Sequence, residues 1–207
     1  RQVVNCIDNA VLSLHEPYAS SASEMVAEVI QYFGYEQLSS YYADAMLAGI
    51  MLDTKDFVMK TGVRTFEAAA YLKKLGADTV AVKRLFAISI ETGIKRSQLV
   101  ETAEIYNRCA IAASEDSSDG IRIATSQAAD ELLGIQGVDA SFVIYAAGTG
   151  ANISARSFGI MNVQIIMEHL GGGGHQTMAA AQLKDISVSN AKKQLMAAID
   201  EYIRSIS

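Results

Sequence analysis

Proline occurs once in this sequence of 207 residues, as Pro17. Because proline interrupts helices, its scarcity leaves the long stretches rich in Ala, Leu, Ile, Met and Glu free to form them. Cysteine is also scarce. Cys6 and Cys109 lack the spacing of a metal site, and two thiols in so long a chain are typical of buried reduced side chains rather than of a disulfide framework. We therefore expect a cytosolic protein.

Positive charge is not in excess. The chain has 17 Lys and Arg against 23 Asp and Glu, which gives a net charge of −6 and a pI near 5.1. Non-specific binding to nucleic acid relies on many Lys and Arg side chains that face phosphates. We therefore expect no long nucleic acid as a partner, and a phosphate ligand would need a local site.

Long hydrophobic runs are missing as well. No apolar stretch is long enough to span a bilayer, and no charged start followed by a hydrophobic segment marks a signal peptide. The sequence contains no Walker loop, nucleophile elbow or Rossmann fingerprint. Its first residue is Arg1 and not Met. We therefore expect that this chain was cut from a longer parent protein. Motifs that are missing here can lie in the rest of that parent.

Half of the residues are hydrophobic, and a chain of this length buries roughly 70% of its unfolded surface. Helical periodicity dominates up to residue 107, and shorter apolar runs such as Phe142–Tyr145 then alternate with helical segments. The pattern predicts an α/β protein with two domains, a mostly helical one followed by a mixed β-sheet flanked by helices. We place the domains at 1–86 and 108–207, joined by a charged helical connection over 87–107.

Capping residues predict where several helices begin. Ser21, Asp78 and Asn162 are expected as N-caps, and Thr65 as the cap of a further helix. Strands are expected over 109–113, 140–146 and 152–157 and through Ala181, with helices over 22–33, 41–51, 65–75, 78–85, 88–107, 124–133 and 188–203. Ordinary structural roles are expected for Tyr41 and Tyr42 (core packing), Glu24 and Glu28 (solvated faces), and His15 and His169.

A run of glycines is the most unusual local feature. Gly171, Gly172, Gly173 and Gly174 are followed at once by His175. Without Cβ atoms, such a loop can approach a ligand and turn its N–H groups inward around an anion, and the imidazole can donate a hydrogen bond to a phosphate oxygen. The alternative is a helix C-cap and turn with an incidental histidine, although a cap needs only one glycine. Composition alone leaves both interpretations open.

Two further residues have alternative interpretations. Asn152, Ser154 and Arg156 project from one face of an alternating strand. At this position Arg156 either forms an exposed salt bridge or binds a phosphate group through its planar guanidinium. Asp53 is either a solvated aspartate at a turn with Thr54 or a metal ligand at the end of a buried helix.

Taken together, these segments resemble the DHHA1 domain of the DHH-family phosphodiesterases. The resemblance rests on Ile153-Ser-Ala-Arg-Ser157, Asn162-Val-Gln164, Ile166-Met-Glu168 and Leu170-Gly-Gly-Gly-Gly-His175. It extends over nearly the whole chain through Glu16-Pro-Tyr-Ala-Ser-Ser21, Gly49-Ile50 with Asp53-Thr-Lys55, Thr61-Gly62 with Arg64-Thr-Phe66, and Gln127-Ala-Ala-Asp-Glu-Leu-Leu133. It is strongest to the membrane-anchored bacterial cyclic-di-AMP phosphodiesterases, in their C-terminal part.

The resemblance implies a Mn²⁺-dependent hydrolase that converts cyclic-di-AMP to linear pApA. The family holds two Mn²⁺ ions through several aspartates and an Asp-His-His triplet, and of these ligands only the last aspartate is present, as Asp53. The triplet would fall just before Arg1, so that residues 1–86 would be the second part of a DHH domain. Ser154, Arg156, the four glycines and His175 would bind the substrate, a cyclic or short linear dinucleotide. One aspartate cannot assemble a two-metal site, so the chain alone is expected to be inactive.

Two other functions remain open. In the first, the parent protein resembles the stand-alone oligoribonucleases and 3′-phosphoadenosine-5′-phosphate phosphatases of the same superfamily. In the second, it is a nucleotide-binding module without catalysis. The resemblance also leaves open a homodimer and a cytoplasmic domain whose parent is anchored in the bacterial cell membrane.

Overall fold

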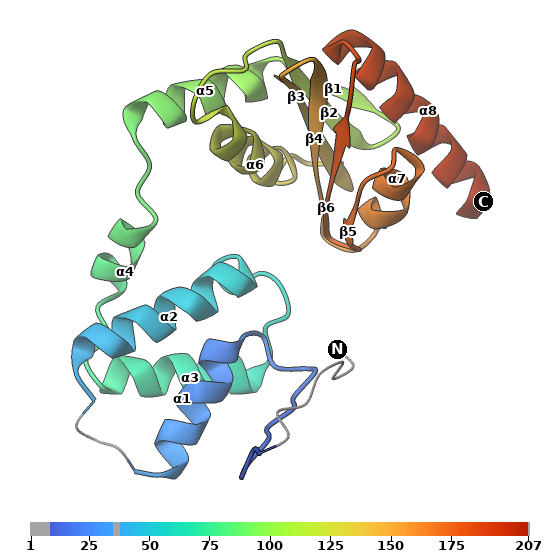
Figure 1. The fold of residues 1–207 in the computed structure, drawn as a ribbon. Coiled ribbons are helices and arrows are strands. Elements are labelled where there is room, and N and C mark those ends of the chain that lie inside the picture. Colours follow the sequence, from blue (N-terminus) through green and yellow to red (C-terminus); the bar gives the residue numbers. More distant parts are fainter. Residues whose placement is uncertain (1–8, 35–37, 207) are drawn as a thin grey trace. The chain divides into compact units, whose positions relative to one another are not determined.

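The computed structural model describes residues 9–34 and 38–206. The chain divides into two compact units, Arg1–Ala87 and Ile88–Ser207, each with hydrophobic core clusters of its own (Figure 1). None of the helices in the described residues is both long and apolar enough to cross a membrane. Cys6 lies outside the described residues. Cys109 is buried, and burial raises the pKa of its thiol to about 12, which fits the reduced side chain expected there.

In the described residues of the first unit, the regular secondary structure is helical. Its helices are α1 (Ala22–Tyr32), α2 (Ser40–Thr54), α3 (Val63–Lys74) and α4 (Thr79–Leu85). Ser21 and Asp78 are N-caps, as predicted, because each side chain accepts a hydrogen bond from a backbone N–H of the first turn. Thr65 was predicted to be the N-cap of the third helix, and this was wrong. The N-cap of α3 is Gly62, whose N–H donates to the Thr65 hydroxyl at 3.1 Å.

Small residues let these helices approach closely. A Cβ on Gly49 in α2 would lie 2.2 Å from the Ser23 Oγ in α1, so a larger residue at this crossing would force the Ser23 side chain to move. The core between the helices includes Leu47, Ile50 and Leu72. The expectation that Tyr41 and Tyr42 belong to the core was wrong: they are 74% and 58% exposed and contact each other edge to face on the surface of α2.

The second unit is a mixed sheet with helices on both faces. Its elements are α5 (Ile90–Glu101), β1 (Glu104–Tyr106), β2 (Cys109–Ser114), α6 (Ile121–Leu132), β3 (Ala140–Ala147), β4 (Gly150–Ser157), α7 (Val163–His169), β5 (Gly173–His175), β6 (Met178–Leu183) and α8 (Val188–Ile206). The six strands are ordered β1-β2-β3-β4-β6-β5, and only the β2–β3 pair is parallel. Asn162 is the N-cap of α7, as predicted. The predicted helical stretch 88–107 ends earlier than expected, since β1 follows α5.

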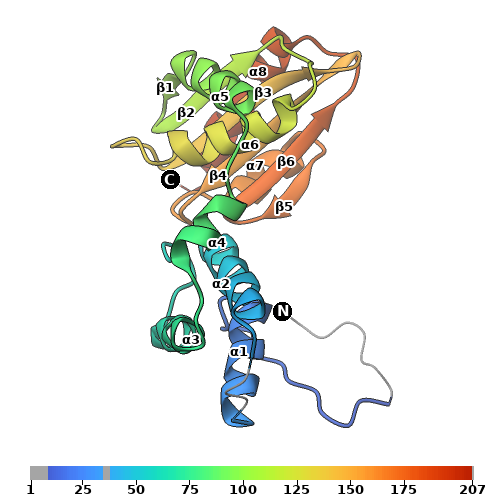
Figure 2. The same ribbon diagram turned by 90° about the vertical axis from the view of Figure 1, so that its left-hand side faces the viewer.

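Strand alternation separates the two faces of the sheet. In β4, Ile153 points into the core formed with α7 and α8, whereas Asn152 and Ser154 point to the other face. On that other face, α5 and α6 pack over β2 and β3 (Figure 1). Figure 2 looks onto this face, with α6 in front of the sheet and β6 and β5 beside it. The polar row of β4 therefore lies along the edge of α6.

Candidate functional site

A cavity of about 430 Å³ lies beside α6 on this face of the sheet. Strand β4 contributes Asn152–Ser154 and Arg156, and β6 contributes Met178–Gln182. The edge strand β5 contributes its three residues, and α6 contributes Arg122 and Ser126 on one side. Of the residues predicted to bind a ligand, Ser154, Arg156, Gly173, Gly174 and His175 line this cavity. The fold thus brings together these predicted residues, although Ser154 and His175 are 21 positions apart in the sequence.

Arg156 is held in place by its neighbours. Its side chain is largely buried, with the residue 9% exposed. The Nε atom donates to the Asp130 carboxylate of α6 at 3.1 Å, and Nη1 donates to the Ala155 carbonyl at 2.9 Å. The salt bridge that the sequence left as one alternative therefore exists, with the Arg156 side chain buried and the Asp130 side chain partly exposed.

Polar side chains along β4 continue the lining. The Asn152 amide donates to the Tyr145 hydroxyl of β3 at 3.1 Å, which orients both groups. Ser154 is half-buried and pairs in register with Ala180 of β6. Because Ala180 is small, the floor of the cavity stays open next to the Ser154 hydroxyl.

The first glycines of the run end helix α7. Gly171 has φ of +73°, a left-handed conformation, and its N–H donates to the Glu168 carbonyl at 2.9 Å. The N–H of Gly172 donates to the Met167 carbonyl at 2.8 Å. This is the hydrogen-bond pattern of a glycine C-cap. The C-cap alternative therefore holds for Gly171, and neither Gly171 nor Gly172 lines the cavity.

The remaining glycines form a strand, which corrects the expectation of a loop. A Cβ on Gly172 would lie 2.2 Å from the Ala180 carbonyl oxygen, and one on Gly174, where φ is +150°, would lie 2.5 Å from the Met178 carbonyl oxygen. Both positions therefore need glycine so that β5 can approach β6. A Cβ on Gly173 would meet no atom within 4 Å. Gly173 is thus the glycine whose missing side chain leaves room in the cavity itself.

His175 ends β5, at the edge of the sheet. It is exposed and pairs in register with Met178. From this position its imidazole can donate a hydrogen bond to an anion in the cavity without breaking any hydrogen bond among the described side chains.

The lining of the cavity is basic. It includes Arg122, Arg156 and His175, and among the described residues no Asp or Glu lines it, although the chain as a whole carries a net charge of −6. Sequence reasoning missed Arg122. The spacing of four residues between Arg122, Ser126 and Asp130 indicates that they share one face of α6, but only the structure shows that Asp130 binds Arg156. Such a lining favours an anionic ligand.

Comparison with known families assigns most of the second unit. Residues 109–205 match the family described as the DHHA1 domain. These residues form a DHHA1 domain. Every residue that lines the cavity falls within this DHHA1 domain.

Curated proteins resemble the chain beyond its DHHA1 domain. It is 47% identical over 199 residues to the cyclic-di-AMP phosphodiesterase PdeA of Listeria monocytogenes, which covers 95% of this chain and 30% of that protein. It is 49% identical, with the same coverage, to the cyclic-di-AMP phosphodiesterase GdpP of Geobacillus thermodenitrificans. The bifunctional oligoribonuclease and PAP phosphatase NrnA of Thermus thermophilus is 26% identical over 92% of this chain and 59% of that protein. The chain thus spans about 30% of the length of the cyclic-di-AMP phosphodiesterases it matches.

A solved structure shares the fold of both units. An exopolyphosphatase-related protein from Bacteroides fragilis superimposes with a TM-score of 0.84 over 96% of this chain and 62% of that chain, at 21% sequence identity. At this identity the likeness supports the fold and not a function.

Asp53 lies outside the DHHA1 domain, near the end of α2, and is exposed. The turn after it is held by Thr54, whose hydroxyl accepts from the Phe57 N–H at 3.0 Å. Lys55, Asp56 and Phe57 all have positive φ, between 51° and 66°, which is rare for three successive residues other than glycine. No group of three or more His, Cys, Asp or Glu side chains in the described residues can hold a metal ion. These residues alone therefore do not fit a two-metal centre.

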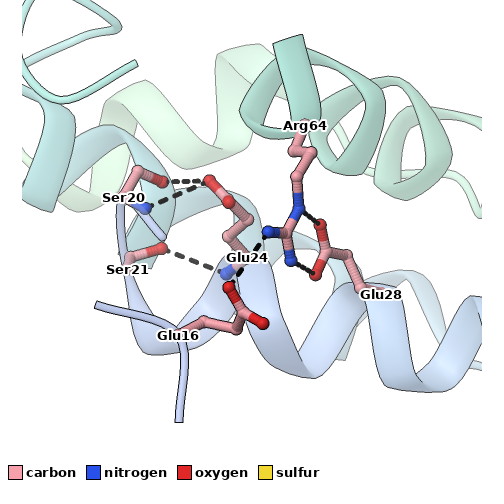
Figure 3. A network of polar contacts seen from close by, with 6 residues as sticks. All are labelled: Glu16, Ser20, Ser21, Glu24, Glu28 and Arg64. Carbon is pink, nitrogen blue, oxygen red and sulfur yellow. Dashed lines mark hydrogen bonds and ion pairs between the residues drawn. The ribbon is translucent and has the colours of Figure 1, made fainter. Parts of the chain in front are cut away.

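A buried carboxylate organises the start of α1 (Figure 3). The prediction that Glu24 is solvated was wrong, since it is 2% exposed. It accepts hydrogen bonds from the Ser20 hydroxyl and from the Ser20 N–H, while its own N–H donates to Ser21 Oγ at 3.0 Å. These bonds attach the chain before α1 to its first turn.

A second network in the same region connects distant segments (Figure 3). Arg64 of α3 forms a two-pronged pair with Glu28 of α1, with N···O distances of 2.8 and 2.6 Å, and also contacts Glu16 at 3.3 Å. Hydrogen bonds to Glu28 and Glu16 raise the pKa of the Arg64 guanidinium above its usual value. Outside this region, His169 faces Glu201 at 3.4 Å, which agrees with an ordinary structural role.

Proposed function

We propose that this chain is part of a phosphodiesterase that hydrolyses cyclic-di-AMP to linear pApA, and that its DHHA1 domain holds the substrate. One observation carries the proposal: a basic cavity without lining carboxylates occurs in the DHHA1 domain of a chain that is 44–49% identical to cyclic-di-AMP phosphodiesterases. The ligand would be a cyclic or short linear dinucleotide.

Each lining residue has a distinct part in this proposal. Arg156 presents a guanidinium whose orientation is set by Asp130, so that little side-chain entropy is lost when a phosphate binds. His175 donates from the edge strand, and Ser154 donates from the floor. Gly173 leaves the space that a phosphate needs to approach the backbone of β5.

The proposal includes a metal that the described residues cannot hold by themselves. We assign Asp53 as one Mn²⁺ ligand of the complete enzyme, because it occupies the position that the resemblance implies and is exposed at the end of α2. The other ligands would come from outside the described residues.

Binding of cyclic-di-AMP to the purified chain, followed by calorimetry, tests the assignment of the cavity. A hydrogen bond to a charged group contributes about 1.5–3 kcal/mol, so Arg156→Gln and His175→Ala should each weaken binding by about 10- to 150-fold. His15→Ala is the matched control, because His15 is an exposed histidine outside the DHHA1 domain. Circular dichroism establishes that each variant is folded.

Equal affinities for the control and the cavity variants would contradict this site. The substrate class has its own test, in which the full-length parent is offered cyclic-di-AMP, a short oligoribonucleotide and 3′-phosphoadenosine-5′-phosphate. Preference for either of the last two would favour the activities named for NrnA. Tight binding without turnover of any of them would favour a nucleotide-binding module.

A further inference from the structure

The geometry points to Arg122 as a second phosphate-binding residue, which makes the cavity a site for ligands with two phosphate groups. This inference rests on the proposed function, because it concerns the same cavity. It adds a residue to which neither the resemblance nor the comparisons assign a role.

The position of Arg122 follows from the face of α6 that borders the cavity. Arg122 lies in the first turn of α6, Ser126 one turn later, and Asp130 a further turn on. At a rise of 1.5 Å per residue, Arg122 and Asp130 are about 12 Å apart along the helix axis. Because Asp130 binds Arg156, the two arginines mark opposite ends of one wall of the cavity.

The charge of Arg122 is not compensated by the described residues. Its guanidinium makes no hydrogen bond or ion pair within the described part of the chain, whereas Arg156 is paired with Asp130. On the neighbouring helix α5, Lys95 and Arg96 are paired with acidic residues, Glu91 and Glu131. An exposed, unpaired arginine beside a cavity can bind an anion without first giving up a partner.

A second hollow continues beyond Arg122. It has a volume of about 580 Å³ and is lined by Gly120, Arg122, Ile123, Ser126 and Gln127. Arg122 and Ser126 line both spaces, so a ligand held at Arg156 can extend past Arg122 into the hollow. The exposed Ile123 offers an apolar surface there, and the buried Gln127 Oε1 has no hydrogen-bond partner within the described residues. These features suit a nucleoside between or beyond two phosphates.

The inference predicts different effects on ligands with one and with two phosphates. Calorimetric titration of the chain with pApA and with AMP compares the two. Arg122→Gln should weaken binding of pApA by about 10-fold and leave binding of AMP unchanged, because AMP has one phosphate and occupies the Arg156 end. Arg156→Gln should weaken both. Lys193→Gln, which removes one exposed charge from α8 on the other face of the sheet, should change neither.

Several outcomes would overturn the inference. If Arg122→Gln leaves the affinity for pApA unchanged, or lowers both affinities by the same factor, Arg122 does not form a second phosphate site, while the proposed function stands. If the unaltered chain binds neither pApA nor AMP, the proposed function fails as well. Arg122→Lys separates charge from geometry: it should recover part of the lost affinity for pApA.

Discussion

At the scale of single residues, charged groups around the sheet are set by their immediate partners. Arg108, in the turn between β1 and β2, pairs with Asp139 just before β3 through N···O distances of 2.5 and 2.8 Å. The arginine hydrogen bonds hold the pKa of Asp139 below its ordinary value of 3.8. The pKa of Asp116 is lowered as well, by hydrogen bonds from Ser118.

The Arg108–Asp139 pair predicts a pH dependence. Because the pKa of Asp139 is lower in the folded state, its contribution to stability is present above pH 3.8 and is lost as the pH falls towards the folded pKa. In Arg108→Gln, NMR titration should show the pKa of the Asp139 carboxyl rising towards its ordinary value, with the pKa of Asp116 unchanged as the internal control. An unchanged pKa of Asp139 in the variant would show that Arg108 is not the cause.

At the scale of elements, the glycine run shows how one segment serves two purposes. Gly171 ends α7, and Gly172 and Gly174 let β5 approach β6. Gly173 has no such packing role, because the space around its Cβ position is open. We therefore propose that stability depends on Gly171, Gly172 and Gly174, and that room for a ligand depends on Gly173.

Alanine substitutions should separate these two roles. Gly174→Ala forces a side chain into the carbonyl of Met178 at a positive φ, and we expect a loss of about 1–3 kcal/mol in the free energy of unfolding. Gly173→Ala is the matched control, with little effect on stability but weaker binding of cyclic-di-AMP. Urea unfolding followed by circular dichroism, together with calorimetry, measures both effects. Equal stabilities of the two variants would contradict this division.

At the scale of the whole molecule, the cavity and the proposed metal ligand belong to different units of the chain. The cavity lies within the DHHA1 domain, whereas Asp53 is one carboxylate, and the described residues contain no metal-binding cluster. Under the proposed function, holding a dinucleotide and cleaving it are therefore separable properties.

This separation predicts that the 207-residue chain binds but does not cleave cyclic-di-AMP. Incubation with cyclic-di-AMP and Mn²⁺, followed by chromatography, should yield no pApA, because one aspartate cannot hold two ions. The full-length parent under identical conditions is the positive control. Mn²⁺-dependent formation of pApA by the chain alone would refute the prediction.

Features that depend on neighbouring residues could be predicted from the sequence. The N-caps Ser21, Asp78 and Asn162 were identified correctly because a cap bonds within its own first turn. The alternation of β4 placed Ser154 and Arg156 on one face because strand periodicity is local. The α/β class followed from the same kind of pattern, whereas the DHHA1 domain was predicted from the resemblance to a known family.

Features that depend on distant residues were decided only by the tertiary structure. The pairing of Arg156 with Asp130 joins β4 to α6 across 26 positions of the sequence. Arg122 gains its place beside the cavity only because α6 packs along β3 and β4. The sequence by itself determined which side chains share a face of a helix or strand, since backbone geometry sets that period. The packing of α6 on the sheet decided which of those faces meet around the cavity, because that depends on contacts between elements far apart in the chain.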